Sequence, residues 1–187
     1  MPEQVLALAN LMNEQLIARA QRGDSEAITT LYHQHVGRIA KYVGYRVTNA
    51  QSVEDITASV FLVMMEKLPK YQERGVPFEA WLYRIASAQI GDHYRHQKKY
   101  PTTTLNIEQS AQEAPIEKQL MDKEQYIELR GALNQLSDEE QTILFLRLVE
   151  RLPHTEVAVL LGKKPQAIAT AQHRALKRLA ALMGKEG

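Results

Sequence analysis

Residues 156–168 of this 187-residue chain have the sequence EVAVLLGKKPQAI, and this stretch decides the fold of the C-terminal half. Ala158 is small enough for a second helix to cross close by. Gly162, four residues later, can adopt the positive φ angle that ends a helix. Pro165 suits the first turn of a following helix, where its missing N–H costs no hydrogen bond, and Ile168 would face inward. This spacing predicts a helix-turn-helix, and a helical hairpin without a DNA-binding role is the alternative.

The second helix of this motif, expected over residues 165–183, has an apolar face and a polar, cationic face. At about 100° per residue, Ile168 and Ala175 share the apolar face. No acidic residue occurs between Lys163 and Lys185, and residues 141–187 contain eight Lys/Arg against three Asp/Glu. A helix that enters the major groove of DNA needs a polar, cationic face of this kind. The side chains expected on it are Gln166, Thr170, His173, Arg174 and Lys177.

Helical periodicity also dominates the rest of the chain, without an alternating pattern that would indicate a strand. Asp24 is expected to be an N-cap. Ser52 and Asp55 resemble a capping box, which would open a helix that runs to about Lys67. Prolines and a glycine then indicate a loop before the next helix. The further helices are expected at about 78–99, 117–135, 138–150, 154–161 and 165–183.

Composition divides the chain into three parts. Residues 101–116 lack periodicity and aromatic residues, and we interpret them as a linker. The wider segment 101–140 is acidic, with nine Asp/Glu against three Lys/Arg, and mildly basic segments flank it. We therefore expect an all-α protein with two helical domains, at residues 1–100 and 117–187, joined by an acidic linker.

The overall composition excludes several classes of protein. The chain is 44% hydrophobic and 24% charged with a net charge of +1, which is ordinary for a globular protein. It has no cysteine, so disulfide frameworks and thiolate metal sites are excluded. No N-terminal stretch resembles a signal peptide, and the apolar stretches are too short to span a bilayer. We expect a soluble, cytoplasmic protein without membrane insertion.

The helix expected over residues 78–99 carries a stripe that is cationic at both ends and small in the middle. Its members are Arg84, Ala88, Gly91, Arg95 and Lys98. A bare stripe flanked by cations lets a phosphate backbone approach closely. Aromatic residues gather at the same end of this region, and cations interleaved with aromatics are typical of proteins that hold unstacked bases. The alternative, equally open, is that Phe78 and Trp81 belong to the core.

The helix expected over residues 52–67 is apolar on two sides. Val53, Ile56, Val60 and Val63 share one face, whereas Phe61 and Met65 are expected to point the opposite way. Either the helix is sandwiched within its own domain, or the second face docks on a partner protein.

Catalytic and metal-binding patterns are weak. The rings of His33 and His35 would lie about 200° apart on a helix. His93 and His96 share a side with Asp92 as their only candidate companion, so surface histidines are favoured over a metal site. No phosphate-binding glycine loop or nucleophile elbow is found. We expect no metal, no cofactor and no enzymatic activity.

Three segments together resemble bacterial sigma factors of the extracytoplasmic-function (ECF) type. Residues 52–62 resemble region 2.2, residues 77–95 resemble regions 2.3 and 2.4, and residues 136–179 resemble region 4. The segments occur in the family's order and spacing and cover nearly the whole chain.

The resemblance implies a dissociable subunit of RNA polymerase, which supplies the chemistry, with core polymerase and promoter DNA as partners and, in many members, an anti-sigma factor. It implies polymerase binding by Asp55, Ala58, Phe61, Leu62 and Met65. It implies recognition and melting of the minus-ten element by Tyr71, Phe78, Trp81, Arg84, Ala88, Gly91, Arg95 and Lys98. It implies recognition of the minus-thirty-five element by Lys164, Gln166, Ala167, Thr170, His173, Arg174 and Lys177.

The chain departs from the family pattern at several of these positions. The usual Gln-Glu pair is Ala58-Ser59, and the usual Asn is Ala88. In the recognition helix the usual Lys and Arg are Ala169 and Ala171, and the usual capping Ser is Lys164. These departures keep two alternatives open, namely a stand-alone helix-turn-helix regulator and a sigma-like interaction protein with weakened promoter recognition.

Overall fold

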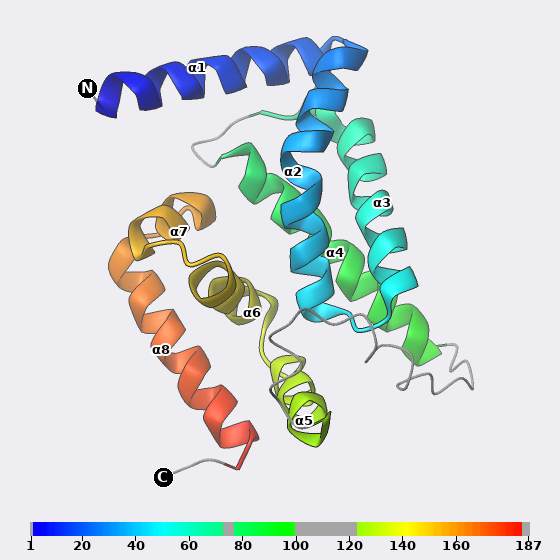
Figure 1. Ribbon diagram of the computed structural model, residues 1–187, viewed down its shortest axis with the longest axis vertical. Helices are drawn as coiled ribbons and strands as arrows, with labels where there is room; N and C mark the ends of the chain where they lie inside the picture. Colours follow the sequence, from blue (N-terminus) through cyan, green and yellow to red (C-terminus); the bar gives the residue numbers. More distant parts are fainter. Residues whose placement is uncertain (1, 73–76, 100–122, 185–187) are drawn as a thin grey trace.

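The computed structural model describes residues 2–72, 77–99 and 123–184, and every regular element among them is a helix (Figure 1). The predicted all-α fold is confirmed. The linker expected over residues 101–116 lies outside the described residues. The elements are α1 (Pro2–Gln21), α2 (Ser25–Arg46), α3 (Ala50–Lys67), the 3₁₀ turn η1 (Leu68–Lys70), α4 (Phe78–Lys99), α5 (Lys123–Leu133), α6 (Asp138–Leu144), the π turn η4 (Phe145–Val149), α7 (His154–Leu161) and α8 (Pro165–Leu182).

In the N-terminal half, α2 and α3 each begin at a residue whose side chain caps the helix. Asp24 caps α2 as predicted, because its carboxylate accepts a hydrogen bond from the Ala27 N–H at 3.1 Å. The capping box predicted at Ser52 is wrong. α3 begins earlier, at Ala50, because the Asn49 side chain accepts from the Ser52 N–H at 2.8 Å. Asn is as strong an N-cap as Ser, and it stands one turn earlier.

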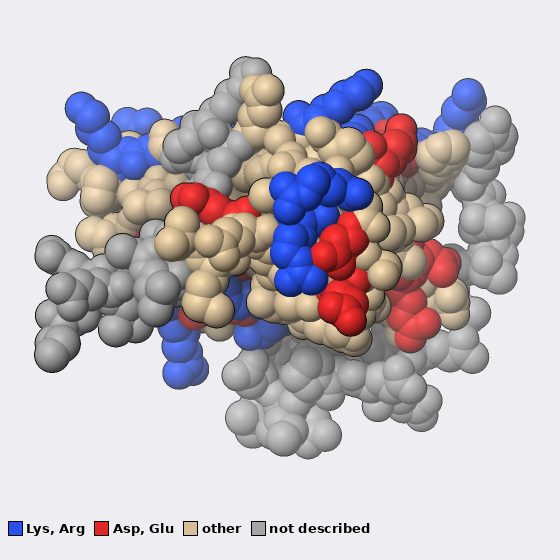
Figure 2. All heavy atoms as spheres, turned by 90° about the horizontal axis from the view of Figure 1, so that it is seen from above, with Lys and Arg blue, Asp and Glu red and all other residues tan. Residues whose placement is uncertain are grey.

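Helices α1 to α4 form a bundle in which α2, α3 and α4 pack against one another. Leu31, Ile39, Val60, Leu82 and Ile90 are fully buried between them. Figure 1 shows α1 running across one end of this bundle. Viewed from that end (Figure 2), the described surface carries separate small groups of acidic and basic side chains. The described surface at this end therefore shows no continuous basic patch of the kind that binding to backbone phosphates favours.

The helix-turn-helix predicted from residues 156–168 is present in α7 and α8. Gly162 ends α7 with a φ angle of 64°, and Pro165 occupies the first turn of α8. Ala158 and Ile168 are buried where the two helices meet. The helix expected over 138–150 instead changes at Phe145 into the π turn η4.

The two halves of the chain are in direct contact. One hydrophobic cluster includes Val60 and Leu82 of the bundle together with Phe145 and Ile168 of the C-terminal half. The Phe145 ring lies 5.1 Å from the ring of Tyr42 in α2, measured between centroids. The bundle and the C-terminal half therefore pack against each other in this structure.

Candidate nucleic-acid interfaces

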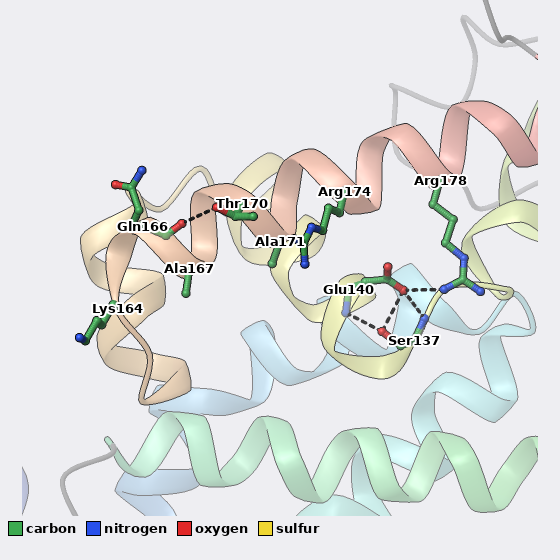
Figure 3. Close-up of a pocket in the computed structure, with 9 residues that line it drawn as sticks. All are labelled: Ser137, Glu140, Lys164, Gln166, Ala167, Thr170, Ala171, Arg174 and Arg178. Atoms are coloured by element: carbon green, nitrogen blue, oxygen red, sulfur yellow. Dashed lines mark hydrogen bonds and ion pairs between the residues drawn. The ribbon is translucent and has the colours of Figure 1, made fainter.

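A surface cavity of about 630 Å³ runs beside α8 and is the first candidate interface (Figure 3). We call it the α8 groove. Ala167, Ala171 and Arg174 point from α8 toward the same side of the helix (Figure 3). The residues that line the groove are Ser137, Glu140, Lys164, Gln166, Ala167, Thr170, Ala171, Arg174 and Arg178.

The charges along the α8 groove are set by one carboxylate. Glu140 accepts hydrogen bonds from the backbone N–H and hydroxyl of Ser137, at 2.8 and 2.9 Å, which completes the capping box of α6. Hydrogen bonding by the Ser137 N–H, and the nearby Arg178, lower the pKa of Glu140. Arg178 pairs with Glu140 at 3.4 Å, whereas Arg174 makes no ion pair with the described part of the chain. Arg174, together with Lys164 at the start of α8, is therefore a cation of the groove available to a ligand.

A polar junction holds the two helices of the motif at their angle. The side-chain oxygen of Gln172, on α8, accepts a hydrogen bond from Arg147 at 3.0 Å and lies 2.9 Å from His154 Nε2 at the start of α7. Arg147 also donates to the Leu152 carbonyl. Sequence reasoning missed this junction, because no local pattern marks residues that bond across such a distance along the chain.

The residues expected to contact the minus-thirty-five element all lie on the surface, but only some of them come together. Lys164, Gln166, Ala167, Thr170 and Arg174 line the α8 groove. The two others are exposed on α8 outside the groove lining: His173 and Lys177.

A second cavity, of about 720 Å³, lies between η1 and α4, and we call it the η1–α4 pocket. The ring centroids of Tyr71 and Trp81 are 4.6 Å apart, and both rings are half-buried. The residues that line the pocket are Glu66, Lys67, Lys70, Tyr71, Gln72, Trp81 and Arg84. It therefore combines two aromatic rings with three cationic side chains.

Phe78 is in the core, which corrects its assignment as a DNA contact. The side chain is 1% exposed, and its ring packs 5.3 Å from Tyr71, 5.4 Å from Trp81 and 5.5 Å from His35. At the first position of α4, its side chain faces α2 and supports the pocket from behind. The alternative that kept both Phe78 and Trp81 in the core therefore holds for Phe78, while Trp81 lines the pocket.

The stripe of residues predicted on α4 is partly exposed to solvent. Arg84, Ala88 and Arg95 are exposed and Gly91 is half-buried, while the Lys98 side chain lies outside the described part. Arg95 pairs with Asp92 one turn earlier, which reduces its effective charge. A methyl group built at Gly91 would meet Arg95 Nη1 at 3.6 Å, an ordinary contact.

Helix α3 presents a different outer face from the one predicted. Phe61 is buried at 4% exposure, with its ring 4.8 Å from that of Tyr32, so its assignment as a surface contact is corrected. Packing on both α2 and α4 widens the buried arc of α3 until it includes Phe61. The exposed apolar residues are Leu62 (61%) and Met65 (43%), and Asp55 and Ala58 are also exposed.

Other kinds of site find no support in the part of the chain that the structure describes. There, no cluster of three or more His, Cys, Asp or Glu side chains is placed to hold a metal ion. None of the described helices has the length and apolar character needed to cross a membrane.

Comparison with known proteins identifies the family. The description "Sigma-70 region 2" matches residues 31–100, and "Sigma-70, region 4" matches residues 126–179. The chain is 30% identical over 171 residues to the ECF RNA polymerase sigma factor BldN of Streptomyces coelicolor, covering 90% of this chain and 65% of that protein. It is 32% identical over 171 residues to the ECF RNA polymerase sigma factor SigD of Mycobacterium tuberculosis, covering 88% of this chain and 80% of that protein.

A similar solved structure is that of CnrH in complex with the cytosolic domain of CnrY, with a TM-score of 0.61 and 20% identity over 94% of this chain and 99% of that one. At this identity the likeness concerns the fold alone. The chain spans about two thirds of the length of BldN and more of SigD. With both region 2 and region 4 present in order, the chain belongs to the sigma-70 family, among the ECF RNA polymerase sigma factors.

Proposed function

We propose that this chain is a dissociable sigma subunit that binds core RNA polymerase and directs promoter recognition, promoter melting and transcription initiation. It contributes no catalytic group, because the polymerase carries out the chemistry. The observation that carries this proposal is the presence, in one chain, of an aromatic, cationic pocket and a helix-turn-helix groove. A regulator that binds only closed duplex has no use for the pocket.

The η1–α4 pocket suits an unstacked base of the minus-ten element. Tyr71 and Trp81 offer ring surfaces to the base, and Lys67, Lys70 and Arg84 surround them with positive charge. Stacking of one base on an aromatic side chain contributes about 1–3 kcal/mol and favours the single-stranded state.

The α8 groove suits the edges of paired bases in the minus-thirty-five element. Gln166 can bond adenine through two hydrogen bonds, and Arg174 favours guanine or a phosphate. Lys164, His173 and Lys177 lie around them on the surface, where contacts to phosphate position the helix without reading sequence.

The outer face of α3 suits the core polymerase. Leu62 and Met65 expose apolar surface on α3, after the exposed residues Asp55 and Ala58. Exposed apolar residues that are surrounded by polar ones favour a protein partner. CnrH was solved with the cytosolic domain of CnrY bound. The sigma factor RpoE was solved in complex with the anti-sigma factor NepR from Bartonella quintana, and by analogy we propose that an anti-sigma factor binds this chain.

Reconstitution with core polymerase tests the proposal. Addition of the chain should direct initiation at a defined set of promoters when transcript starts are mapped across a genome. Met65→Asp should weaken pull-down of core polymerase at least tenfold. Met12→Asp, the same change at an exposed methionine of α1, is the matched control and should leave it intact.

Three results would count against the proposal in different ways. Failure of the wild-type chain to direct any defined start contradicts it outright. Tight duplex binding by the chain alone, with a Kd of about 10⁻⁸ M or below, favours the stand-alone regulator. Polymerase binding without a shared upstream motif favours the interaction protein, which Ala169 and Ala171 also favour.

A further inference from the structure

The two rings that wall the η1–α4 pocket are held in different ways. Trp81 lies within α4, so the hydrogen bonds of a helix fix its backbone. Tyr71 lies outside the described helices, directly after the turn η1, and its backbone is extended at φ −64° and ψ 134°. The two ring centroids are nevertheless 4.6 Å apart. The position of Tyr71 therefore depends on contacts that its own backbone and ring make, and not on a helix.

A side chain of α1 makes one of these contacts. Gln21 Nε2 donates to the Leu68 carbonyl at 3.1 Å and to the Tyr71 carbonyl at 2.7 Å. The amide nitrogen carries two hydrogens, so one side chain can make both bonds. Leu68 is the first residue of η1, and its carbonyl also accepts from the Tyr71 N–H at 3.0 Å. Gln21 thus closes the turn from outside and bonds to the backbone that carries the Tyr71 ring.

The end of α1 is itself fixed in place. Gln21 is the last residue of α1, and Gly23 then turns the chain with a φ angle of 85°. Asp24 caps α2 and also accepts a hydrogen bond from Arg19 of α1 at 2.7 Å. Figure 1 shows this corner of the chain beside the end of α3, where η1 begins. A well-anchored helix end therefore presents the Gln21 donor to η1.

Apolar packing surrounds the Gln21 contact. Ile17 and Ala20 of α1 are 5% and 3% exposed, Leu68 of η1 is 1% exposed, and all three belong to one hydrophobic cluster. Gln21 is half-buried beside them. A carbonyl that is partly shielded from water loses more when its donor is removed, because water replaces the donor less easily. The contact should therefore contribute measurably to the position of Tyr71.

We propose that Gln21 is a positioning residue for promoter opening, which holds the Tyr71 ring beside Trp81 so that an unstacked base meets a preformed aromatic wall. This inference rests on the proposed function. When the wall is already in place, binding of the base does not have to order the tyrosine, and more of the stacking energy is available to stabilise the opened strand. Through this contact α1 acts on promoter opening without touching DNA.

The rate of promoter opening by the holoenzyme tests this role. Gln21→Met keeps an unbranched side chain of similar length but removes both donors. It should slow opening, followed over time by permanganate footprinting, by roughly 2- to 12-fold, the factor that corresponds to one net hydrogen bond. Gln15→Met makes the same change at an exposed position of α1. It is the matched control and should leave the rate unchanged.

A double-mutant cycle shows whether Gln21 acts through Tyr71. In a Tyr71→Ala background, which lacks the ring, Gln21→Met should cause no further slowing. A merely structural contribution would instead add to the loss from Tyr71→Ala, because independent effects are additive. Gln21→Lys keeps N–H donors on an unbranched side chain and suits the last turn of a helix. It should therefore open promoters faster than Gln21→Met.

Fluorescence of the free chain reports on the pocket without DNA. Trp81 is the only tryptophan of the chain, and its ring lies against that of Tyr71. Gln21→Met should raise the quenching of this fluorescence by acrylamide, because release of the Tyr71 ring exposes more of the indole. Gln15→Met should leave the quenching unchanged. Circular dichroism of both variants should match that of the wild type.

The outcomes separate this role from the proposed function. If the wild-type chain directs no defined start with core polymerase, both fail. If it does, but Gln21→Met opens promoters at the wild-type rate, the positioning role alone is overturned. An undiminished effect of Gln21→Met in the Tyr71→Ala background, or unchanged quenching of Trp81, also overturns it. Loss of helicity in Gln21→Met, or equally slow opening by Gln21→Lys, would make Gln21 a structural residue and likewise count against the role.

Discussion

The η1–α4 pocket and the α8 groove are both concave and both carry cations, but their walls differ. Aromatic rings of Tyr71 and Trp81 wall the pocket. The groove is lined by the small side chains of Ala167 and Ala171 and by polar side chains such as Gln166 and Arg174. A ring surface stacks on the face of any unpaired base, whereas polar side chains suit the edges of paired bases. The difference indicates that one chain binds DNA in two states, opened and closed.

The two sites also differ in what supports them. Behind the pocket, Phe78 packs on the pocket rings and on His35. Beside the groove, Glu140 and Arg178 form a polar support on α6 and α8. Apolar packing holds a ring at a fixed orientation, and charged hydrogen bonds hold the groove edge while leaving Arg174 for a ligand.

The largest expected effect follows from removing a wall of the pocket. Trp81→Ala should slow promoter opening by roughly 5- to 150-fold, because loss of one stacking aromatic costs about 1–3 kcal/mol. Permanganate footprinting measures the opened strand, and Trp81→Phe should retain much of the activity. If opening is unchanged in a folded Trp81→Ala protein, the ring is structural and the contrast between the two sites is lost.

A substitution in the groove should give a different result. Gln166→Ala should relax sequence preference at one upstream position, at a cost of about 1–3 kcal/mol. It should not slow initiation from a template that already contains an unpaired bubble. Selection of initiating templates from a randomised upstream library measures the preference. Trp81→Ala should leave the selected upstream motif unchanged. An identical motif from Gln166→Ala and wild type would mean that this helix does not recognise bases.

A substitution in the stripe on α4 should raise the stability of the protein and weaken its binding to DNA. Gly91→Ala should raise the free energy of unfolding by about 0.5–1 kcal/mol, because glycine is unfavourable inside a helix and the added methyl group meets only Arg95 Nη1 at 3.6 Å. The same methyl group should weaken binding of the holoenzyme to a single-stranded minus-ten oligonucleotide. Urea unfolding and fluorescence anisotropy measure the two effects. Binding unchanged by the methyl group would place the DNA backbone elsewhere.

The smallest expected effect is a difference in pH dependence. Burial lowers the pKa of His35, while nearby Glu79 raises it and Arg38 lowers it. The unfolded chain therefore takes up this proton near pH 6.5 and the folded chain does not, so the free energy of unfolding falls as the pH drops below about 6.5. Glu140, whose pKa is lowered, contributes stability that is fully present above about pH 4.5 and is lost below it.

Unfolding midpoints between pH 5 and pH 8 measure this difference. His35→Leu should flatten the slope, and a remainder is expected from His93, whose pKa burial also lowers. Glu140→Gln should leave the slope in this range unchanged. Equal slopes in wild type and His35→Leu would show that His35, which packs behind the pocket, does not cause the pH dependence of the free energy of unfolding.

Much of the fold and part of each site could be predicted from local sequence. Ala158, Gly162, Pro165 and Ile168 specify the helix-turn-helix because each acts within its own turn or on the next helix. The exposed cationic front of α8 and the aromatic region around Trp81 followed from helical spacing. Burial of Phe61 and Phe78 did not, because it depends on how many neighbours surround each helix.

The sequence by itself determined most of the helices, the caps at Asp24 and Gly162, and the resemblance to the family, but it did not predict α1, the start of α3 at Ala50 or the π turn η4. Only the tertiary structure decided which side of α3 is exposed, which rings line the pocket, and that the two halves meet. Arg46 and Asp138 are 92 residues apart in the chain, and Tyr42 and Thr142 are 100 apart. Periodicity and capping depend on residues within a few positions of one another, so pairs at such separations become visible only when the folded helices bring them together.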